Sequence, residues 1–438
     1  MKLTLVAPAT DVSRRTGRRP KGTPFFHYYK LGIATLAGAT PPDIEVEAVD
    51  EMVDLWDPRT HPTDGVAISA LTALAPRAYQ LARTLRERGI PVILGGMHPT
   101  FLPEEAGRHA DAVVTGAGEL VWEQVCRDWQ RGALKPVYAA CQNDTSIHVP
   151  PARRDIFRNP FYPPLDIIQF SRGCVHRCRF CSVNAFFRGR YHYRPIAEVR
   201  AELAGCRRKH LMVADDNLYG DRAYCLEVLG ALAPLGRYLG IQGTVDMAFD
   251  GEVMAAARAA KVGAVFVGIE SVVTESLREA DKLHNQIERY AEAIASFHRH
   301  GIFVEGGLMF GFDHDEPDVF RRTLDFVDRI DLDVAQVAIV TPMPGTRLFA
   351  ELDAAGRLTD RDWAHYDCNN VVYRPARMTQ LELLNGVEWF RREFYRRRAI
   401  ARRAWKGRRW FDLTTLATQA ALNLGFRRNH QLGLDYPP

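Results

Sequence analysis

The sequence contains no apolar run long enough to cross a membrane. A spanning helix needs roughly 20 predominantly apolar residues in succession, and no segment of the 438 residues approaches that length. The opening residues, MKLTLVAPAT, form only a short apolar run, whereas a secretory signal has a basic start and a longer apolar core. We therefore expect residues 3–8 to form a β-strand and the protein to be cytoplasmic.

The sequence also has little excess charge of either sign. Its formal net charge is +4, which does not by itself require a nucleic-acid partner, and we expect none. Charged residues make up 25% and hydrophobic residues 47%, which is typical of globular proteins. The length predicts two or three domains.

Cysteine is sparse and unevenly distributed. Three of the eight cysteines fall within eight positions and the others are scattered, which excludes a disulfide framework. The pattern is typical of a reducing compartment and a single metal site. We expect Cys206, Cys225 and Cys368 to be structural, with the alternative that Cys368, in DCNN, reaches the active site. The remaining scattered cysteines are Cys126 and Cys141.

Residues 1–135 alternate between strand and helix patterns, which predicts a doubly wound, Rossmann-like α/β domain with a parallel sheet. Ligands of such domains bind beyond the carboxyl ends of the strands. No G-x-G-x-x-G follows the first strand, so a nucleotide or flavin site is not expected. The predicted strands are 3–8, 44–51, 65–70, 91–96 and 112–116, and the predicted helices are 76–89 and 119–132.

A second βα series follows a proline-rich linker at 136–165. Its six strands over 166–345 predict a partial (β/α)6 barrel, with the chemistry at the carboxyl ends of the strands. Residues 346–438 are expected to be mostly helical and are partly basic. The predicted barrel strands are 166–171, 210–216, 240–246, 264–271, 303–311 and 334–342.

Three cysteines spaced C-x-x-x-C-x-x-C follow the first barrel strand in SRGCVHRCRFCSV. Three thiolates suit three irons of a [4Fe-4S] cluster and leave the fourth iron open for a small molecule. A structural zinc site would need four ligands, and no further Cys or His follows Cys181 at the usual spacing. We therefore predict Cys174, Cys178 and Cys181 as cluster ligands.

The motif resembles the radical S-adenosylmethionine (SAM) superfamily, whose signature has an aromatic residue before the last cysteine, here Phe180. The resemblance implies that SAM chelates the open iron. One electron, from a donor such as flavodoxin or ferredoxin, then cleaves SAM to a 5′-deoxyadenosyl radical. Later strand ends also resemble the family, although acidic residues there could instead cap helices. The implied SAM-binding residues are Phe180, Asp215, Asp216, Asn217, Glu270, Ser271, Gly311 and Pro342.

The N-terminal domain, together with its linker, resembles that of cobalamin-binding radical SAM enzymes of the class B methyltransferase type. The likeness lies in LGIATLAGATPPDIEVEAVDE, GVAISALT, GGMHPTFLPEE and GAGE. The alternative is a degenerate domain kept as a scaffold. The implied cobalamin-binding residues are Ser69, Leu71, Thr72, Gly95, Gly96, His98, Pro99, Thr100, Gly116, Gly118 and Glu119.

One departure from that family concerns the cobalt ligand. Cobalamin domains that bind cobalt through histidine carry D-x-H-x-x-G after the first strand, whereas APATDVSRRTGRRP has no histidine. We expect cobalamin with its base detached and no histidine on cobalt; His98 is the less favoured alternative.

The resemblance implies C-methylation of an unactivated carbon in a secondary metabolite or lipid, with one SAM re-methylating cobalamin and another giving the radical. The same parts could instead serve ring closure, ring contraction or oxidation without methyl transfer. An iron–sulfur binding or sensor protein without turnover is the alternative from another class.

The segment 389–411 combines many arginines with aromatic residues. Its arginines could lie over the barrel in solvent. They could instead meet a soluble anionic substrate or a redox partner. Peripheral contact with anionic lipid is a third reading, whereas no nucleic-acid module accompanies the run. The aromatic residues for a lipid contact would be Trp389, Phe390, Phe394, Trp405 and Trp410.

Overall fold

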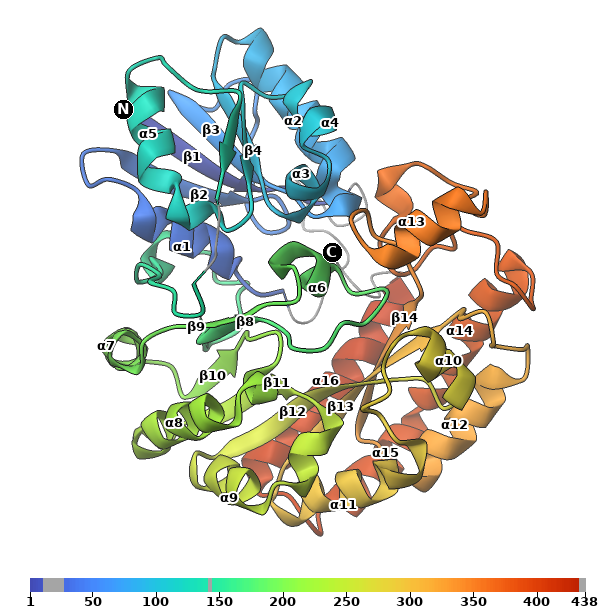
Figure 1. The fold of residues 1–438 in the computed structure, drawn as a ribbon. Coiled ribbons are helices and arrows are strands. Elements are labelled where there is room, and N and C mark those ends of the chain that lie inside the picture. The colour runs from blue at the N-terminus through green and yellow to red at the C-terminus, as the bar shows by residue number, and fades with distance from the viewer. Residues whose placement is uncertain (11–26, 141–143, 433–438) are drawn as a thin grey trace.

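The computed structural model describes residues 1–10, 27–140 and 144–432. It contains two six-stranded parallel sheets and a two-stranded hairpin (Figure 1). Most of the stretch that lacks the cobalt-binding histidine motif lies outside the described residues. None of the described helices is long and apolar enough to cross a membrane. The seven described cysteines are all free thiols.

The first sheet has the order β2-β1-β3-β4-β5-β6. Its central strands β3, β4 and β5 are near-continuous apolar runs because both faces are covered: α1 and α5 pack on one face and α2 on the other. The doubly wound domain is confirmed, but its last strand, β6, falls in the segment predicted as linker. The elements are β1 Lys2–Ala7, α1 Leu31–Ala39, β2 Glu45–Asp50, β3 Gly65–Ser69, η1 Thr72–Leu74, α2 Ala75–Glu87, β4 Val92–Gly95, α3 Met97–Phe101, α4 Pro103–Gly107, β5 Ala112–Thr115, η2 Gly118–Leu120, α5 Trp122–Gln130, β6 Val137–Ala139 and η3 Arg154–Ile156.

The second sheet has the order β14-β13-β12-β11-β10-β7, which is the expected six-stranded partial barrel. Its outer face is covered by helices that form the largest apolar core of the molecule. The elements are β7 Leu165–Ile168, α7 Ile196–Gly205, β10 His210–Val213, η4 Leu218–Gly220, α8 Arg222–Leu232, η5 Ala233–Leu235, β11 Tyr238–Gly243, η6 Val245–Phe249, α9 Gly251–Ala259, β12 Val262–Glu270, α10 Thr274–Glu279, η7 Ile287–Arg289, α11 Tyr290–Arg299, β13 Phe303–Phe310, α12 Val319–Arg329 and β14 Val334–Ile339.

The inner face of the barrel is less tightly filled than the outer face. In β12 the outward residues Val265, Val267 and Ile269 are fully buried, whereas Phe266 and Gly268 between them are only partly buried. Successive strand residues point to opposite faces, so the half-buried set lines the inside. The inner face of β12 is therefore less completely buried than its outer face.

The C-terminal region closes the barrel and reaches the first domain. Phe411 packs against Phe303 and Val334 at the amino ends of β13 and β14, together with side chains of α16. The C-terminal region also contacts the first domain, where the indole nitrogen of Trp363 donates a hydrogen bond to Glu105 at 3.0 Å. The elements are α13 Arg347–Ala354, η8 Trp363–His365, α14 Gln380–Phe394, α15 Arg397–Gly407 and α16 Leu413–Leu432.

Candidate active site

The three predicted cluster cysteines lie on the loop between β8 (Ser171–Gly173) and α6 (Ser182–Phe187), within the connection from β8 to its hairpin partner β9 (Tyr191–Tyr193). Gly173 turns the chain into this loop with a φ of +79°, where any Cβ would collide with the Arg190 carbonyl oxygen. Only glycine fits this position without strain.

The loop has the donor set that a three-cysteine cluster needs. The three thiols are close enough for their charges to interact, and the Asn217 side-chain amide lies 3.7 Å from the Cys174 sulfur. Within the described ranges no three His, Cys, Asp or Glu side chains are close enough to hold one metal ion. Three thiolates on one loop are the donors that three irons of a [4Fe-4S] cluster need.

A buried ion pair stands beside these cysteines. The Lys282 ammonium donates to Glu270 at 2.6 Å, and both side chains are largely buried. Burial raises the pKa of the Cys178 thiol, and the Lys282 charge opposes that rise. A Cβ at Gly268 would collide with both partners of the pair, so this glycine gives them room. Glu270 was predicted from the sequence, whereas Lys282 was missed because no motif marks it.

The two aspartates of the predicted SAM set differ in their surroundings. Asp215 is fully buried and accepts hydrogen bonds from the backbone of Phe170 and Ser171 at 2.7 and 2.8 Å, and from the Ser171 hydroxyl. It therefore holds the turn that precedes the cluster loop, and a direct SAM contact does not fit its geometry. Asp216 accepts from the Gly173 N–H at 2.8 Å and also lines the main cavity. Burial raises its pKa to about 6.

Ser271, Gly311 and Phe180 of the predicted SAM set have local structural partners, and Pro342 is buried. The Ser271 hydroxyl accepts a hydrogen bond from the Val273 N–H at 3.0 Å. Gly311 has a φ of +105°, and the space of a Cβ there is taken by the Tyr373 hydroxyl, so the glycine serves packing against the C-terminal region. Pro342 is buried just after β14. Phe180 packs with Phe312, at a ring separation of 6.3 Å.

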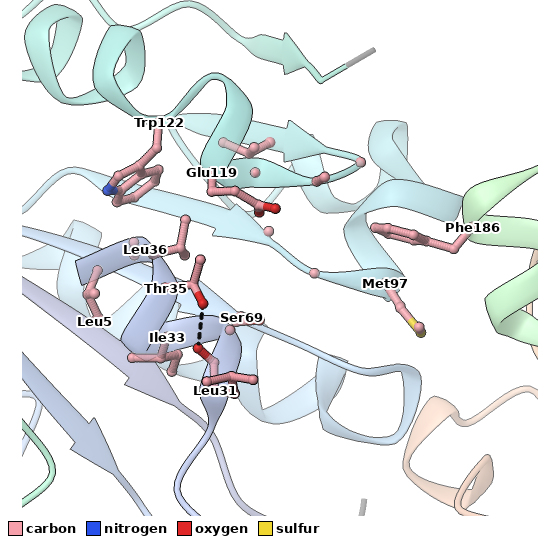
Figure 2. A pocket seen from close by; sticks show the side chains of 18 of the residues that line it. Leu5, Leu31, Ile33, Thr35, Leu36, Ser69, Met97, Glu119, Trp122 and Phe186 are labelled. Carbon is pink, nitrogen blue, oxygen red and sulfur yellow. Dashed lines mark hydrogen bonds between the residues drawn. The ribbon is translucent and has the colours of Figure 1, made fainter. Parts of the chain in front are cut away.

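A cavity of about 340 Å³ opens at the carboxyl ends of the first sheet, between α1 and η2 (Figure 2). Its inner wall is apolar and is formed by Leu5, Ile33, Ile93 and Trp122. Its outer rim is formed by the barrel residues Gln169, Arg172, Phe186, Phe187, Ala214 and Asp216. The cavity thus spans the two domains, and its apolar inner end suits an aromatic group such as the detached base of cobalamin.

The predicted cobalamin residues divide into two groups. The small residues of three strand ends line the cavity, as expected for a wall that a flat ring approaches. Thr100 lies behind this wall: its hydroxyl donates to the Gly96 carbonyl at 2.7 Å and accepts from the Gly116 N–H at 3.0 Å. The lining members are Ser69, Gly95, Gly96, Gly116, Gly118 and Glu119. The members that do not line the cavity are Leu71, Thr72, His98, Pro99 and Thr100.

His98 is placed away from the cavity. Its ring is fully buried, lies within hydrogen-bond distance of the Tyr79 hydroxyl (2.9 Å) and meets Trp363 edge-on. Burial lowers its pKa. A cobalt ligand must face the corrin, so the alternative assignment of His98 to cobalt does not fit this geometry. The residue instead joins the first domain to the C-terminal region.

An ion pair between the two domains borders the cavity. Arg172 of β8 donates to Glu119 of η2, and its Nε donates to Gln169 at 2.8 Å. Arg172 is two residues before Cys174, so one side chain links the cluster loop to the rim of the cavity. Sequence analysis missed Arg172, because its partner lies 53 residues away.

Comparisons with known proteins agree with this two-part site. Residues 168–327 match the Radical SAM superfamily and residues 26–125 match the B12 binding domain. The bacteriochlorophyllide d C-12(1)-methyltransferase of Chlorobaculum tepidum is 30% identical over 78% of this chain and 76% of its own. The C-8(2)-methyltransferase of that organism is 26% identical over 93% and 95%.

A cyclase and a solved structure are also similar. The anaerobic magnesium-protoporphyrin IX monomethyl ester cyclase of Cereibacter sphaeroides is 26% identical over 84% of this chain and 63% of its own. The radical SAM methyltransferase TsrM from Kitasatospora setae, solved with cobalamin and a [4Fe-4S] cluster, shares the fold with a TM-score of 0.63 at 16% identity, over 81% of this chain and 75% of its own. The chain therefore belongs to the cobalamin-binding radical SAM enzymes, whose cofactors are a [4Fe-4S] cluster, SAM and cobalamin.

Proposed function

We propose that this enzyme methylates an unactivated carbon of a small-molecule substrate. The observation that carries the proposal is the shared border of the two cofactor sites. Asp216 lines the cavity and also binds the Gly173 N–H, next to the first cluster cysteine. Arg172 likewise borders the cavity and precedes that cysteine by two residues. A methyl donor and a radical source on one border can act on the same carbon.

The chain's own residues would bind and orient the cofactors. Cys174, Cys178 and Cys181 would hold the cluster, with Asn217 against the first thiolate. Lys282 and Glu270 offer a cation and a carboxylate for the carboxylate and amino group of SAM. When bound, the cluster and SAM supply a hydrogen-abstracting radical, and cobalamin supplies the methyl group.

We place the substrate inside the barrel, below the cluster loop. Phe266 and Glu305 are register partners on β12 and β13 and both are half-buried on the inner face. The next inward pair is Gly268 and Gly307, which adds no side chains. Two residues of a strand rise about 6.6 Å, so this glycine pair separates Glu305 from the Lys282–Glu270 pair, and the Phe266 ring and the ion pair take the room that side chains would fill there.

Glu305 would orient the substrate. Burial alone raises its pKa to about 7, although the residue keeps some exposed surface. Near neutral pH it can donate or accept a hydrogen bond. The floor formed by Phe303, Phe411 and Val334 keeps water from entering at the other end.

The names of the relatives suggest a substrate to test first. Two of them methylate bacteriochlorophyllide d, so we propose a tetrapyrrole as the first class. Reconstituted enzyme would be incubated with reductant, cobalamin, deuteromethyl-SAM and bacteriochlorophyllide d, and the product analysed by mass spectrometry. A product heavier by one labelled methyl supports the proposal, and Cys178→Ala, which lacks a cluster ligand, is the matched control.

The similarity to a cyclase supports a second candidate function, which is ring formation without methyl transfer. The same incubation distinguishes the two candidates. A changed product without the labelled methyl would sink the methylation proposal and favour the cyclase-like reaction. An enzyme that turns over neither SAM nor substrate after full cluster loading would favour a sensor.

A further inference from the structure

The arginine-rich segment forms a defined surface at the end of the barrel away from the cluster. Helix α15 buries Ile400, Arg403 and Gly407 against its neighbours. On the opposite side, Arg398, Arg402 and Trp405 follow the i, i+4, i+7 spacing of one helix face, and all three are exposed. We call this side of α15, continued through residues 408–413, the basic face.

The arginines of residues 389–411 differ in their surroundings, and only some of them are available to a partner. Arg391 and Arg403 are buried and donate to the Val337 and Phe394 carbonyl oxygens at 2.6 and 2.8 Å. Arg402 pairs with Asp328 at 2.5 Å, and Lys406 pairs with Asp331. In contrast, four exposed arginines have no carboxylate partner among the described residues. They are Arg397, Arg398, Arg408 and Arg409.

Two apolar side chains project from the same surface. Leu413 is 86% exposed and Trp405 is 70% exposed, which makes them the two most exposed large apolar side chains of the described chain. The Arg408 guanidinium lies 4.6 Å from the centre of the Trp405 ring. Isolated exposed apolar residues are ordinary, but a tryptophan and a leucine eight residues apart among unpaired arginines form an amphipathic patch.

The other aromatic residues of the segment do not belong to this patch. Phe390 and Phe394 are fully buried in the barrel core, so the expectation that they enter a lipid interface is wrong. Trp389 is half-buried beneath Arg321, whose guanidinium lies 4.9 Å from its ring centre. Trp410 is half-buried beside His298. The surface therefore depends on one tryptophan, one leucine and the arginines around them.

We propose that the basic face docks the enzyme on an anionic lipid bilayer. The unpaired arginines match phosphate headgroups in charge, and Trp405 and Leu413 reach below them into the interface. A soluble anion would use the arginines but would leave both apolar side chains in water. The basic face lies at the amino ends of the barrel strands, so docking there leaves the cluster loop and the first domain free.

The test uses the full-length protein and sedimentation with vesicles. One set contains 30% phosphatidylserine in phosphatidylcholine and the other phosphatidylcholine alone. We expect sedimentation with the anionic set only, falling as salt is raised. The Arg398→Glu/Arg409→Glu variant should bind at least roughly thirtyfold more weakly, because it loses the usual contribution of two basic residues near a charged membrane and adds two repelling charges. The variant Arg207→Glu/Arg208→Glu makes the same charge change at two exposed arginines of the α7–β10 loop and should bind normally.

The apolar half of the proposal has its own readout. Brominated lipid should quench part of the tryptophan fluorescence of the wild type, and Trp405→Ser should remove that quenching. Leu413→Ser should weaken binding, whereas Leu381→Ser, at a leucine 65% exposed elsewhere, should not. Equal sedimentation of the two arginine variants, absence of quenching, or binding of polyuridylic acid RNA without binding of vesicles would overturn the proposal. Thermal unfolding checks that each variant is folded.

Discussion

Filling the cavity between α1, α5 and the first sheet should weaken cobalamin binding. Ala67 lies in β3, is buried, and lines the cavity on the side of Ile33 and Ile93. We expect Ala67→Phe to place a ring in the space that the cobalamin base would use. The cavity holds about 340 Å³, so the ring has room. The free energy of unfolding without cofactor should therefore stay unchanged or rise, rather than fall by the roughly 1–3 kcal/mol of an overpacked core.

The loss of binding can be worked out from buried area. An aromatic group about the size of a tryptophan side chain buries about 150–250 Å², which at about 25 cal/mol per Å² is worth about 4–6 kcal/mol. Blocking the cavity should then weaken hydroxocobalamin binding about a thousandfold or more. The small change Ala67→Ser is the matched control and should bind nearly as the wild type does.

The assay is titration calorimetry with hydroxocobalamin and with cobinamide, a corrin that lacks the nucleotide base. We expect the wild type to prefer hydroxocobalamin, and Ala67→Phe to bind both equally weakly. Retained hydroxocobalamin affinity in a folded Ala67→Phe variant would refute the assignment of the cavity. So would a wild type that does not distinguish the two ligands.

The remaining predictions concern the inside of the barrel. Lys282→Met leaves Glu270 buried without its partner and should lower the free energy of unfolding by about 3 kcal/mol. Adding Glu270→Met should restore most of that loss. Urea unfolding measures both variants, and strictly additive effects of the two substitutions would contradict the pairing. The pKa of Glu305, raised to about 7, means that the folded state holds a proton between about pH 4.5 and 7 that the unfolded state has lost. Stability should fall as pH rises through that window, by at most about 3 kcal/mol, and Glu305→Gln should remove this part of the fall. Unfolding of the wild type and of Glu305→Gln at pH 4.5 and at pH 8 tests the direction of this change in stability. A Glu305→Gln variant that is less stable than the wild type at pH 8 would contradict it.

The sequence was sufficient for the architecture because the signals there are local. Continuous apolar runs identified strands that are covered on both faces, and the cysteine spacing identified the loop that holds the cluster ligands. The glycines at strand ends identified a wall of the cavity. Short β6, with three residues, gave too weak a pattern to separate it from the linker.

What the sequence could not show depends on contacts between distant residues. Asp215 looks like a ligand-binding aspartate at a strand end, yet its carboxylate accepts hydrogen bonds from the backbone N–H groups of Phe170 and Ser171. His98 looks like an axial ligand, yet its ring turns towards Trp363, 265 residues later in the chain. Lys282 and Arg172 carry no motif, and only folding brings them to Glu270 and Glu119.

The most direct test of the account is the cleavage of SAM, because it needs no knowledge of the substrate. Enzyme with a fully reconstituted cluster would be reduced with dithionite in the presence of SAM, and 5′-deoxyadenosine measured by chromatography. The account predicts 5′-deoxyadenosine from the wild type and from Ala67→Phe, and none from Cys178→Ala. A fully cluster-loaded wild type that releases none, or a Cys178→Ala variant that releases as much as the wild type, would contradict it.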